Sequence, residues 1–170
     1  MRILGIDPGT ATTGLGLIES NGHGISIIKF DWIETLKGGK PEQRLNEIYH
    51  KMKEQLNQLQ PDVIAIEQVF FATNVRTAIA VSQAKGVIML ACAHLNLPLT
   101  EFSPMHIKKV VTGNGRAKKD EMKKVVRNLL QYSDGTRLRS PNKKKTHFDD
   151  VADALAIAIC YAKDGQSSVA

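Results

Sequence analysis

Two short apolar runs, residues 2–7 (RILGID) and 62–67 (DVIAIE), constrain the fold most, because each has the pattern of a buried strand and ends in a carboxylate. Between them lie two further strand-like runs, 14–19 and 24–35, and a segment, 41–59, whose apolar residues recur with the helical period. A strand reached through a right-handed helical crossover runs parallel to its neighbour in the sheet. We therefore expect residues 62–67 to run parallel to residues 2–7.

The rest of the chain continues to alternate between strand and helix patterns. We expect a long apolar helix at 75–95, a strand at 97–102, helices at 104–111 and 118–130, and an Ala-rich helix at 149–162. This order predicts an α/β fold with a mixed five-stranded sheet that is flanked by helices on both faces. Because no repeat or long linker divides the chain, we expect one domain over residues 1–163 and a flexible C-terminal tail at 164–170.

Cysteine usage and hydropathy indicate the compartment. Cys92 and Cys160 stand apart in apolar helical segments, which gives no disulfide framework and no zinc-ligand spacing. The opening residues lack the apolar core of a secretion signal. The apolar run at 151–162 contains Asp153 and is shorter than the about 20 residues that a membrane span needs. We therefore expect a cytoplasmic protein with no membrane partner.

The net charge of +6 is unevenly distributed along the chain. Residues 105–147 hold 13 of the 23 lysines and arginines but only three acids, which is a local excess of +10. The remaining residues carry a small negative excess. A polyanionic partner such as a nucleic acid is the natural interpretation of the basic region, and a solvated basic face is the alternative.

Four acids stand where apolar patterning would not place them: Asp7, Glu67, Asp150 and Asp153. Asp7 and Glu67 end buried strands that we expect to be parallel, so both reach the same edge of the sheet. Asp150 and Asp153 are three residues apart on one helix face. Carboxylates brought together need a cation, and oxygen ligands without sulfur suit Mg²⁺ or Mn²⁺. The set predicts a two-metal centre for displacement at phosphorus.

Four motifs resemble those of the RuvC family of Holliday-junction resolvases, within the ribonuclease H-like superfamily. They are GIDPG at 5–9, AIEQVF at 65–70, the basic loop GNGRAKK at 113–119 and DVADALA at 150–156. The resemblance covers residues 2–163. It implies a ribonuclease H-like fold and a magnesium-dependent endodeoxyribonuclease. The activity that it implies is the resolution of four-way DNA junctions by paired symmetric nicks with 5′-phosphate ends, in homologous recombination and repair.

The same resemblance assigns roles to individual residues. It implies that Asp7, Glu67, Asp150 and Asp153 hold two Mg²⁺ ions, with Mn²⁺ as an expected substitute. It also implies DNA contacts from the basic residues around the loop and from an aromatic side chain at the branch point: Phe70, Lys108, Arg116, Lys118 and Lys119. Its implied partners are a second copy of this chain, in a homodimer, and the branch-migration proteins RuvA and RuvB.

Other interpretations of these residues stay open at this stage. Asp7-Pro8-Gly9-Thr10 is similar to the phosphate loop of ATP-using kinases, although those proteins need a second such domain. Small ribosomal-RNA-processing nucleases share the opening motif, and a structure-specific DNA-binding protein without nuclease activity would share the basic loop. Asp149 could cap its helix or pair with Asp153 as a ligand, and His147 could join the metal site or lie on a surface loop.

Overall fold

The computed structural model describes residues 1–21, 23–36, 38–69, 75–132 and 148–167. Five strands form one sheet: β1 (Arg2–Asp7), β2 (Thr12–Ser20), β3 (Ile25–Glu34), β4 (Val63–Glu67) and β5 (Leu99–Phe102). Their order across the sheet is β3-β2-β1-β4-β5. The first three strands are antiparallel, whereas β4 is parallel to both β1 and β5. The predicted mixed sheet and the parallel pairing of residues 2–7 with 62–67 are therefore confirmed.

Five helices complete the described part of the chain: α1 (Pro41–Leu59), α2 (Val75–His94), α3 (Pro104–Thr112), α4 (Lys119–Tyr132) and α5 (Phe148–Ser167). A proline stands in the first turn of both α1 and α3, where its missing N–H costs no helical hydrogen bond. The predicted end of the last helix at Ala162 is wrong, because α5 continues to Ser167. No proline follows Ala162, so nothing in the sequence forces the helix to stop there.

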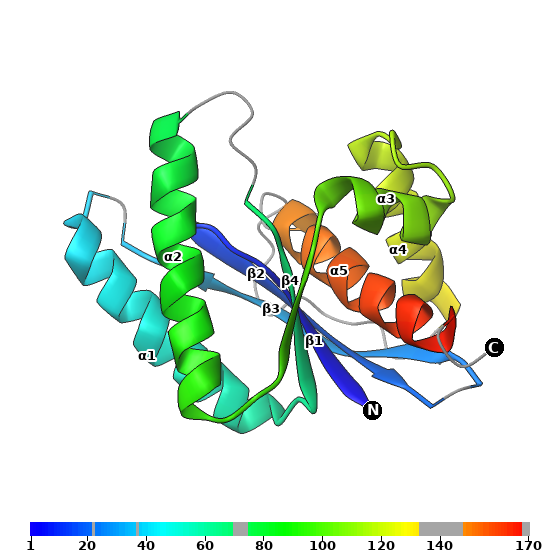
Figure 1. Ribbon diagram of the computed structural model, residues 1–170, viewed down its shortest axis with the longest axis horizontal. Coiled ribbons are helices and arrows are strands. Elements are labelled where there is room, and N and C mark those ends of the chain that lie inside the picture. The colour runs from blue at the N-terminus through cyan, green and yellow to red at the C-terminus, as the bar shows by residue number, and fades with distance from the viewer. Residues whose placement is uncertain (22, 37, 70–74, 133–147, 168–170) are drawn as a thin grey trace.

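The sheet is covered on both faces, as predicted (Figure 1). Alternate residues of β1 point to opposite sides, so Ile3 packs with the apolar faces of α3, α4 and α5, whereas Leu4 and Ile6 pack with α1 and α2. β4 divides in the same way, with Ala65 on the α5 side and Ile64 on the α2 side. The central strands are therefore buried on both faces, which leaves only their ends for polar chemistry.

Glycines bring α5 unusually close to the sheet. A Cβ on Gly5 of β1 would collide with the backbone of Ala154, and a Cβ on Gly14 of β2 would collide with the carbonyl oxygen of Asp150. Since only glycine allows backbones to approach so closely, these positions let the first turns of α5 lie directly on β1 and β2. This contact determines where the acids of α5 stand relative to the strand ends.

Within the described residues, α2 is the helix that is long and apolar enough to cross a bilayer, judged by length and composition. Part of it belongs to the core, where Ala84, Ile88 and Ala91 are fully buried. Its other side leaves large apolar side chains exposed at Val75, Ile79, Met89 and Leu90. α2 therefore combines a face that packs in this domain with an apolar face that has no cover within the described chain.

Candidate metal centre and nucleic-acid interface

Asp7 and Glu67 stand side by side at one edge of the sheet. Ile6 of β1 is in register with Ile66 of β4, so the next residue of each strand is one of the two acids. Neighbouring strands lie about 4.8 Å apart, which places the two carboxylates within reach of a common ligand. This arrangement is the one that the sequence predicts for two parallel strands that end in acids.

α5 brings the other two acids to the same place. Gly14 pairs with Asp7 across β1 and β2, and the same glycine lies against the backbone of Asp150. The first turn of α5 is therefore held over the end of β1. Asp153 follows Asp150 by about one helical turn on the same face, so both side chains are directed to one side of the helix.

The charges of the other three acids reach Asp7. Burial raises the pKa of Asp7 to about 8, and the charges of Asp153, Glu67 and Asp150 add to this rise. Burial and the charge of Asp153 also raise the pKa of Glu67, although Lys108 and Lys119 oppose the shift. Carboxylates that are partly desolvated and repel one another favour a cation between them.

Lys119 supplies one positive charge at this cluster. Its Nζ lies 2.9 Å from Oδ2 of Asp153. Burial acts to lower the pKa of Lys119, but the hydrogen bond and charge of Asp153, together with the charges of Asp149 and Asp7, raise it overall. Lys119 is thus a charged ammonium group within the acid cluster. A basic residue so close to the acids lies where a phosphate beside them would meet it.

A cavity of about 210 Å³ opens beside these residues. Its charged lining consists of the acids Glu67 and Asp153 and the lysines Lys108 and Lys119. Its floor is apolar and includes Ile107 of α3 and Ile157 of α5. Two of the predicted acids and two of the predicted DNA-binding lysines therefore share one concave surface.

The donor set suits hard divalent cations. The four candidate ligands offer only carboxylate oxygens, and no sulfur or imidazole nitrogen belongs to the described cluster. Mg²⁺ and Mn²⁺ prefer such oxygens, and a charge of +2 offsets the burial and the repulsion that together raise the pKa of Asp7. The residues at this edge of the sheet therefore fit the cations that the sequence predicts.

Comparison with known proteins assigns the chain to a family. The profile described as crossover junction endodeoxyribonuclease RuvC matches residues 3–161. The chain belongs to the RuvC family. The RuvC of Moorella thermoacetica is 44% identical over 162 residues, which are 95% of this chain and 91% of that protein. The RuvC of Caldicellulosiruptor saccharolyticus is 43% identical over 168 residues, which are 98% and 95% of the two chains.

A solved structure agrees with this assignment and with the predicted ribonuclease H-like fold. Thermus thermophilus RuvC in complex with a Holliday junction substrate superposes with a TM-score of 0.82 at 27% identity. The match covers 99% of this chain and 96% of that one. Similarity therefore extends over nearly the whole RuvC-family chain, including the strand ends and the helix that carry the acids.

The basic loop of this RuvC-family chain joins α3 to α4. Gly113 ends α3 with a φ of 82°, a conformation that favours glycine, and Arg116 N–H donates to Oδ1 of Asn114 at 3.0 Å. Lys108 lies on α3, while Arg116 and Lys118 lie in the loop. The predicted contact residue Phe70 and the open candidate His147 lie outside the described residues.

Asp149, which the sequence left open, is directed toward α4. Its Oδ1 lies 2.7 Å from Nζ of Lys123. The hydrogen bond from Lys123 lowers the pKa of Asp149, in contrast to the raised pKa of Asp7 and Glu67. Asp149 therefore pairs with a neighbouring helix, and it differs electrostatically from the acids of the cluster.

Two supporting groups of the site were missed by sequence reasoning. The buried Thr13 donates from Oγ1 to the carbonyl of Gly9 at 2.9 Å, and Arg44 donates from Nη2 to the carbonyl of Thr10 at 2.7 Å. Both bonds hold the loop that follows Asp7. Arg44 lies on α1, 34 residues after Thr10 in the sequence, so the local sequence pattern does not predict this contact.

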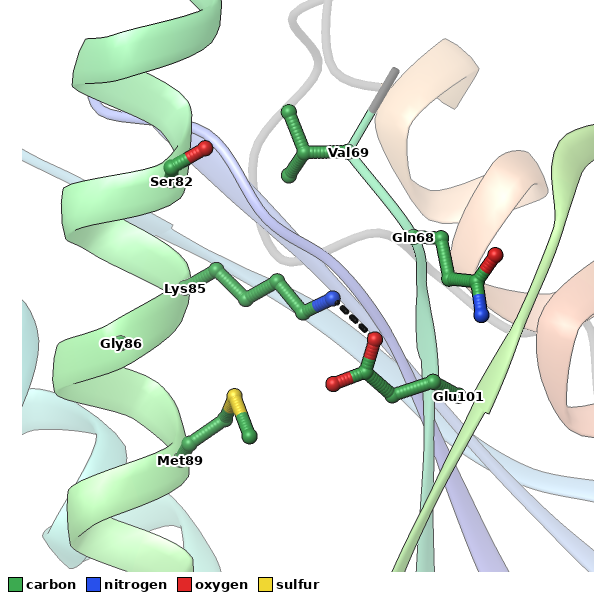
Figure 2. Close-up of a pocket in the computed structure, with 7 residues that line it drawn as sticks. All are labelled: Gln68, Val69, Ser82, Lys85, Gly86, Met89 and Glu101. Carbon is green, nitrogen blue, oxygen red and sulfur yellow. Dashed lines mark hydrogen bonds and ion pairs between the residues drawn. The ribbon is translucent and has the colours of Figure 1, made fainter.

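The sequence also does not predict the ion pair between Lys85 and Glu101. Nζ of Lys85 lies 2.6 Å from Oε2 of Glu101. Figure 2 shows Lys85 reaching from α2 across a hollow to Glu101 on β5, with Gln68 and Val69 nearby. The hollow has a volume of about 590 Å³. The ion pair links α2 to β5. It lies close to Gln68 and Val69, the residues that follow Glu67. A lysine within the apolar 75–95 segment was the only signal for it.

Proposed function

We propose that this protein is a structure-specific endonuclease that resolves four-way DNA junctions by paired, symmetric nicks in recombination and repair. The observation that carries the proposal is the meeting of Asp7, Glu67, Asp150 and Asp153 beside two lysines in a RuvC-family chain. The relative from Thermus thermophilus, which has nearly the same length and fold, is described in complex with a Holliday junction substrate. The whole catalytic unit lies within residues 1–163.

Asp7, Glu67, Asp150 and Asp153 hold two Mg²⁺ ions, for which Mn²⁺ can substitute. When bound, such ions supply Lewis-acid activation of a water molecule and stabilisation of the leaving oxygen at phosphorus. The ends of two paired strands hold Asp7 and Glu67 rigidly. The other two acids lie on α5, which packs against β1 and β2. Cleavage leaves a 5′-phosphate and a 3′-hydroxyl, so the nicks can be religated.

The basic side chains bind and orient the scissile strand. Lys108 and Lys119 line the cavity with Glu67 and Asp153, and their ammonium groups contact the scissile strand or its phosphates. Arg116 and Lys118 extend the same surface along the α3–α4 loop. Phe70 follows Glu67 by three residues and stacks on a base at the branch point.

The protein acts as a homodimer in the cytoplasm, where it works with RuvA and RuvB and has no membrane partner. A four-way junction has two-fold symmetry, so two identical active sites match its two scissile strands. The uncovered apolar side chains of α2, such as Ile79 and Leu90, supply the dimer surface. The same surface accounts for the high apolar content of α2 without a bilayer.

A cleavage assay tests the proposal. The purified protein is incubated with a synthetic immobile four-way junction, or with linear duplexes of the same arm sequences, in Mg²⁺ or in EDTA. We expect paired nicks at symmetric positions on the junction, in Mg²⁺ only. Equal cutting of junction and duplex would contradict structure specificity. Binding of the junction without nicks, by folded protein in Mg²⁺ or Mn²⁺, would favour a DNA-binding protein that lacks nuclease activity.

A further inference from the structure

We propose that His106, Cys160 and Asp164 form a second metal site, for a borderline-soft divalent ion such as Zn²⁺. One potential ligand atom from each of the three side chains lies within 4.8 Å of the other two. No spacing motif predicts this group, because His106 is 58 residues from Asp164 along the chain. The fold brings them together where the start of α3 meets the last turns of α5.

The three side chains form a site with a buried sulfur floor and an open rim. Cys160 is fully buried, whereas the side chains of His106 and Asp164 are 43% and 37% exposed. Nε2 of His106 lies 2.6 Å from Oδ2 of Asp164. Cys160 and Asp164 are four residues apart on α5 and therefore share a helix face. The exposed imidazole and carboxylate can meet an ion from solvent, whereas the sulfur lies in the interior.

The imidazole is held in place by neighbouring groups that are not part of the metal site. Its ring stacks on Phe102, with centroids 5.8 Å apart and planes at 8°, and Phe102 in turn meets the edge of Tyr161. The backbone N–H of His106 donates to Oγ of Ser103, the N-cap of α3. Less ordering of His106 is therefore required when an ion binds, which favours affinity.

The donor set selects the kind of ion. Nitrogen, sulfur and oxygen from one histidine, one cysteine and one aspartate are typical zinc ligands, and a fourth position is left for water. Tetrahedral bonds of about 2.0–2.3 Å separate ligand atoms by roughly 3.3–3.8 Å. The contact between His106 and Asp164 must open slightly from 2.6 Å, which their exposed positions allow. Mg²⁺ avoids thiolates, so this site and the carboxylate cluster take different ions.

Binding at this site exchanges a proton for the metal. A cysteine that binds no ion is ordinarily a neutral thiol, whereas the metal ligand is the thiolate. On binding, the S–H bond is replaced by a bond between sulfur and the metal, and the proton leaves to solvent. The metal therefore decides whether the sulfur is a thiol or a thiolate.

The second site is distinct from the catalytic cluster. Asp164 is eleven residues beyond Asp153 on α5, which corresponds to about 16 Å along the helix. An ion there would tie α3 to α5. Because α3 carries Lys108 two residues after His106, the ion would stabilise the base of the DNA-binding surface without touching the reacting phosphate.

Titration with Co²⁺, a spectroscopic substitute for Zn²⁺, tests the proposal. Excess Mg²⁺ is included so that the carboxylate cluster is occupied. We expect one Co²⁺ per chain to produce a thiolate-to-cobalt charge-transfer band in the near ultraviolet, and Zn²⁺ to remove the band by displacement. Cys160→Ala should abolish the band, and Asp164→Asn should weaken Co²⁺ affinity by at least about tenfold. The matched control is Cys92→Ala, which removes a buried cysteine of α2 and should keep the band.

A second measurement guards against misfolded variants. Zn²⁺ should raise the thermal midpoint of the wild-type protein and of Cys92→Ala, but not that of His106→Phe, which preserves an aromatic ring against Phe102 and removes the nitrogen ligands. The absence of a thiolate band in the wild-type protein would overturn the proposal. So would a band of undiminished strength in folded Cys160→Ala.

Discussion

Nζ of Lys119 lies 2.9 Å from Oδ2 of Asp153, so the first residue of α4 places an ammonium group on an acid of the proposed metal centre. The lysine side chain is 54% exposed, which leaves it free to turn toward a phosphate once a cation balances the carboxylate. This ion pair connects the proposed metal ligands with the proposed phosphate-binding lysines. The same lysine is paired with the acid cluster and belongs to the surface that we propose to bind DNA.

Asp7→Asn should abolish cleavage and preserve junction binding. The substitution keeps the size of the side chain but removes one ligand charge from the centre. If that ligand supports about 4 kcal/mol of transition-state stabilisation, the nicking rate falls about a thousandfold. Single-turnover nicking and gel-shift binding measure the two effects separately. Asp62→Asn is the matched control at the opposite end of β4, where Asp62 accepts a hydrogen bond from Arg2 N–H, and it should cleave normally.

Asp7→Asn should also change how the stability of the protein depends on pH. The pKa of Asp7 rises from an ordinary 3.8 to about 8 in the folded protein, so ionisation is unfavourable there. The neutral carboxyl of Asp7 favours the folded state. Its contribution to the free energy of unfolding is full below the unfolded pKa and is lost as pH rises toward about 8. In EDTA, the thermal midpoint of the variant should therefore exceed that of the wild type more at about pH 8 than at about pH 5. An equal difference at both values would contradict the assignment, and Mg²⁺ should reduce the difference at the higher pH.

Lys119→Ala should weaken junction binding and make it less sensitive to salt. Each phosphate contact that is lost reduces the slope of log K against log salt by about one. Fluorescence-anisotropy titrations over a series of salt concentrations give this slope. Lys53→Ala provides a control on α1, which covers the opposite face of the sheet. A slope identical to that of the wild type would remove Lys119 from the interface.

Gly14→Ala should displace Asp150 by pushing α5 away from the sheet. The new methyl group would collide with the carbonyl oxygen of Asp150, so α5 must shift away from β2. Overpacking of this kind costs about 1–3 kcal/mol of stability, and movement of Asp150 should lower the nicking rate as well. Chemical denaturation and cleavage rates check both effects. Gly24→Ala has open space around the added Cβ and should leave both unchanged.

Leu90→Glu should yield monomers if α2 forms the dimer surface. Leu90 is 50% exposed on the uncovered side of α2, where a charge costs little in the monomer but much in an apolar interface. Sedimentation velocity should show a dimer for the wild type and a monomer for the variant. Lys53→Glu is a charge-changing control on α1. A dimeric Leu90→Glu protein would place the interface elsewhere.

Much of the fold could be predicted from the sequence because the controlling signals are local. Short apolar runs indicated the strands, the helical period indicated α1, and the crossover rule correctly made β4 parallel to β1. The meeting of Asp7 with Glu67 follows from that topology. The predicted end of α5 at Ala162 is wrong because no proline follows it to stop the helix, which continues to Ser167.

The features that escaped prediction depend on contacts between distant segments. Arg44 reaches the loop after Asp7 from another helix, and Lys85 finds Glu101 only after α2 has packed beside β5. The group of His106, Cys160 and Asp164 is hidden for the same reason, since 58 residues separate the histidine from the aspartate. Spacing rules for metal ligands detect residues that are close in the sequence, whereas these three residues come close only in the folded protein.

Anomalous scattering from crystals soaked in Mn²⁺ tests the central claim most directly. Manganese peaks should lie among the carboxylate oxygens of the four acids in the wild-type protein and weaken or vanish in Asp7→Asn. Manganese bound only elsewhere, or bound among these oxygens with equal strength in wild-type and Asp7→Asn crystals, would contradict the account.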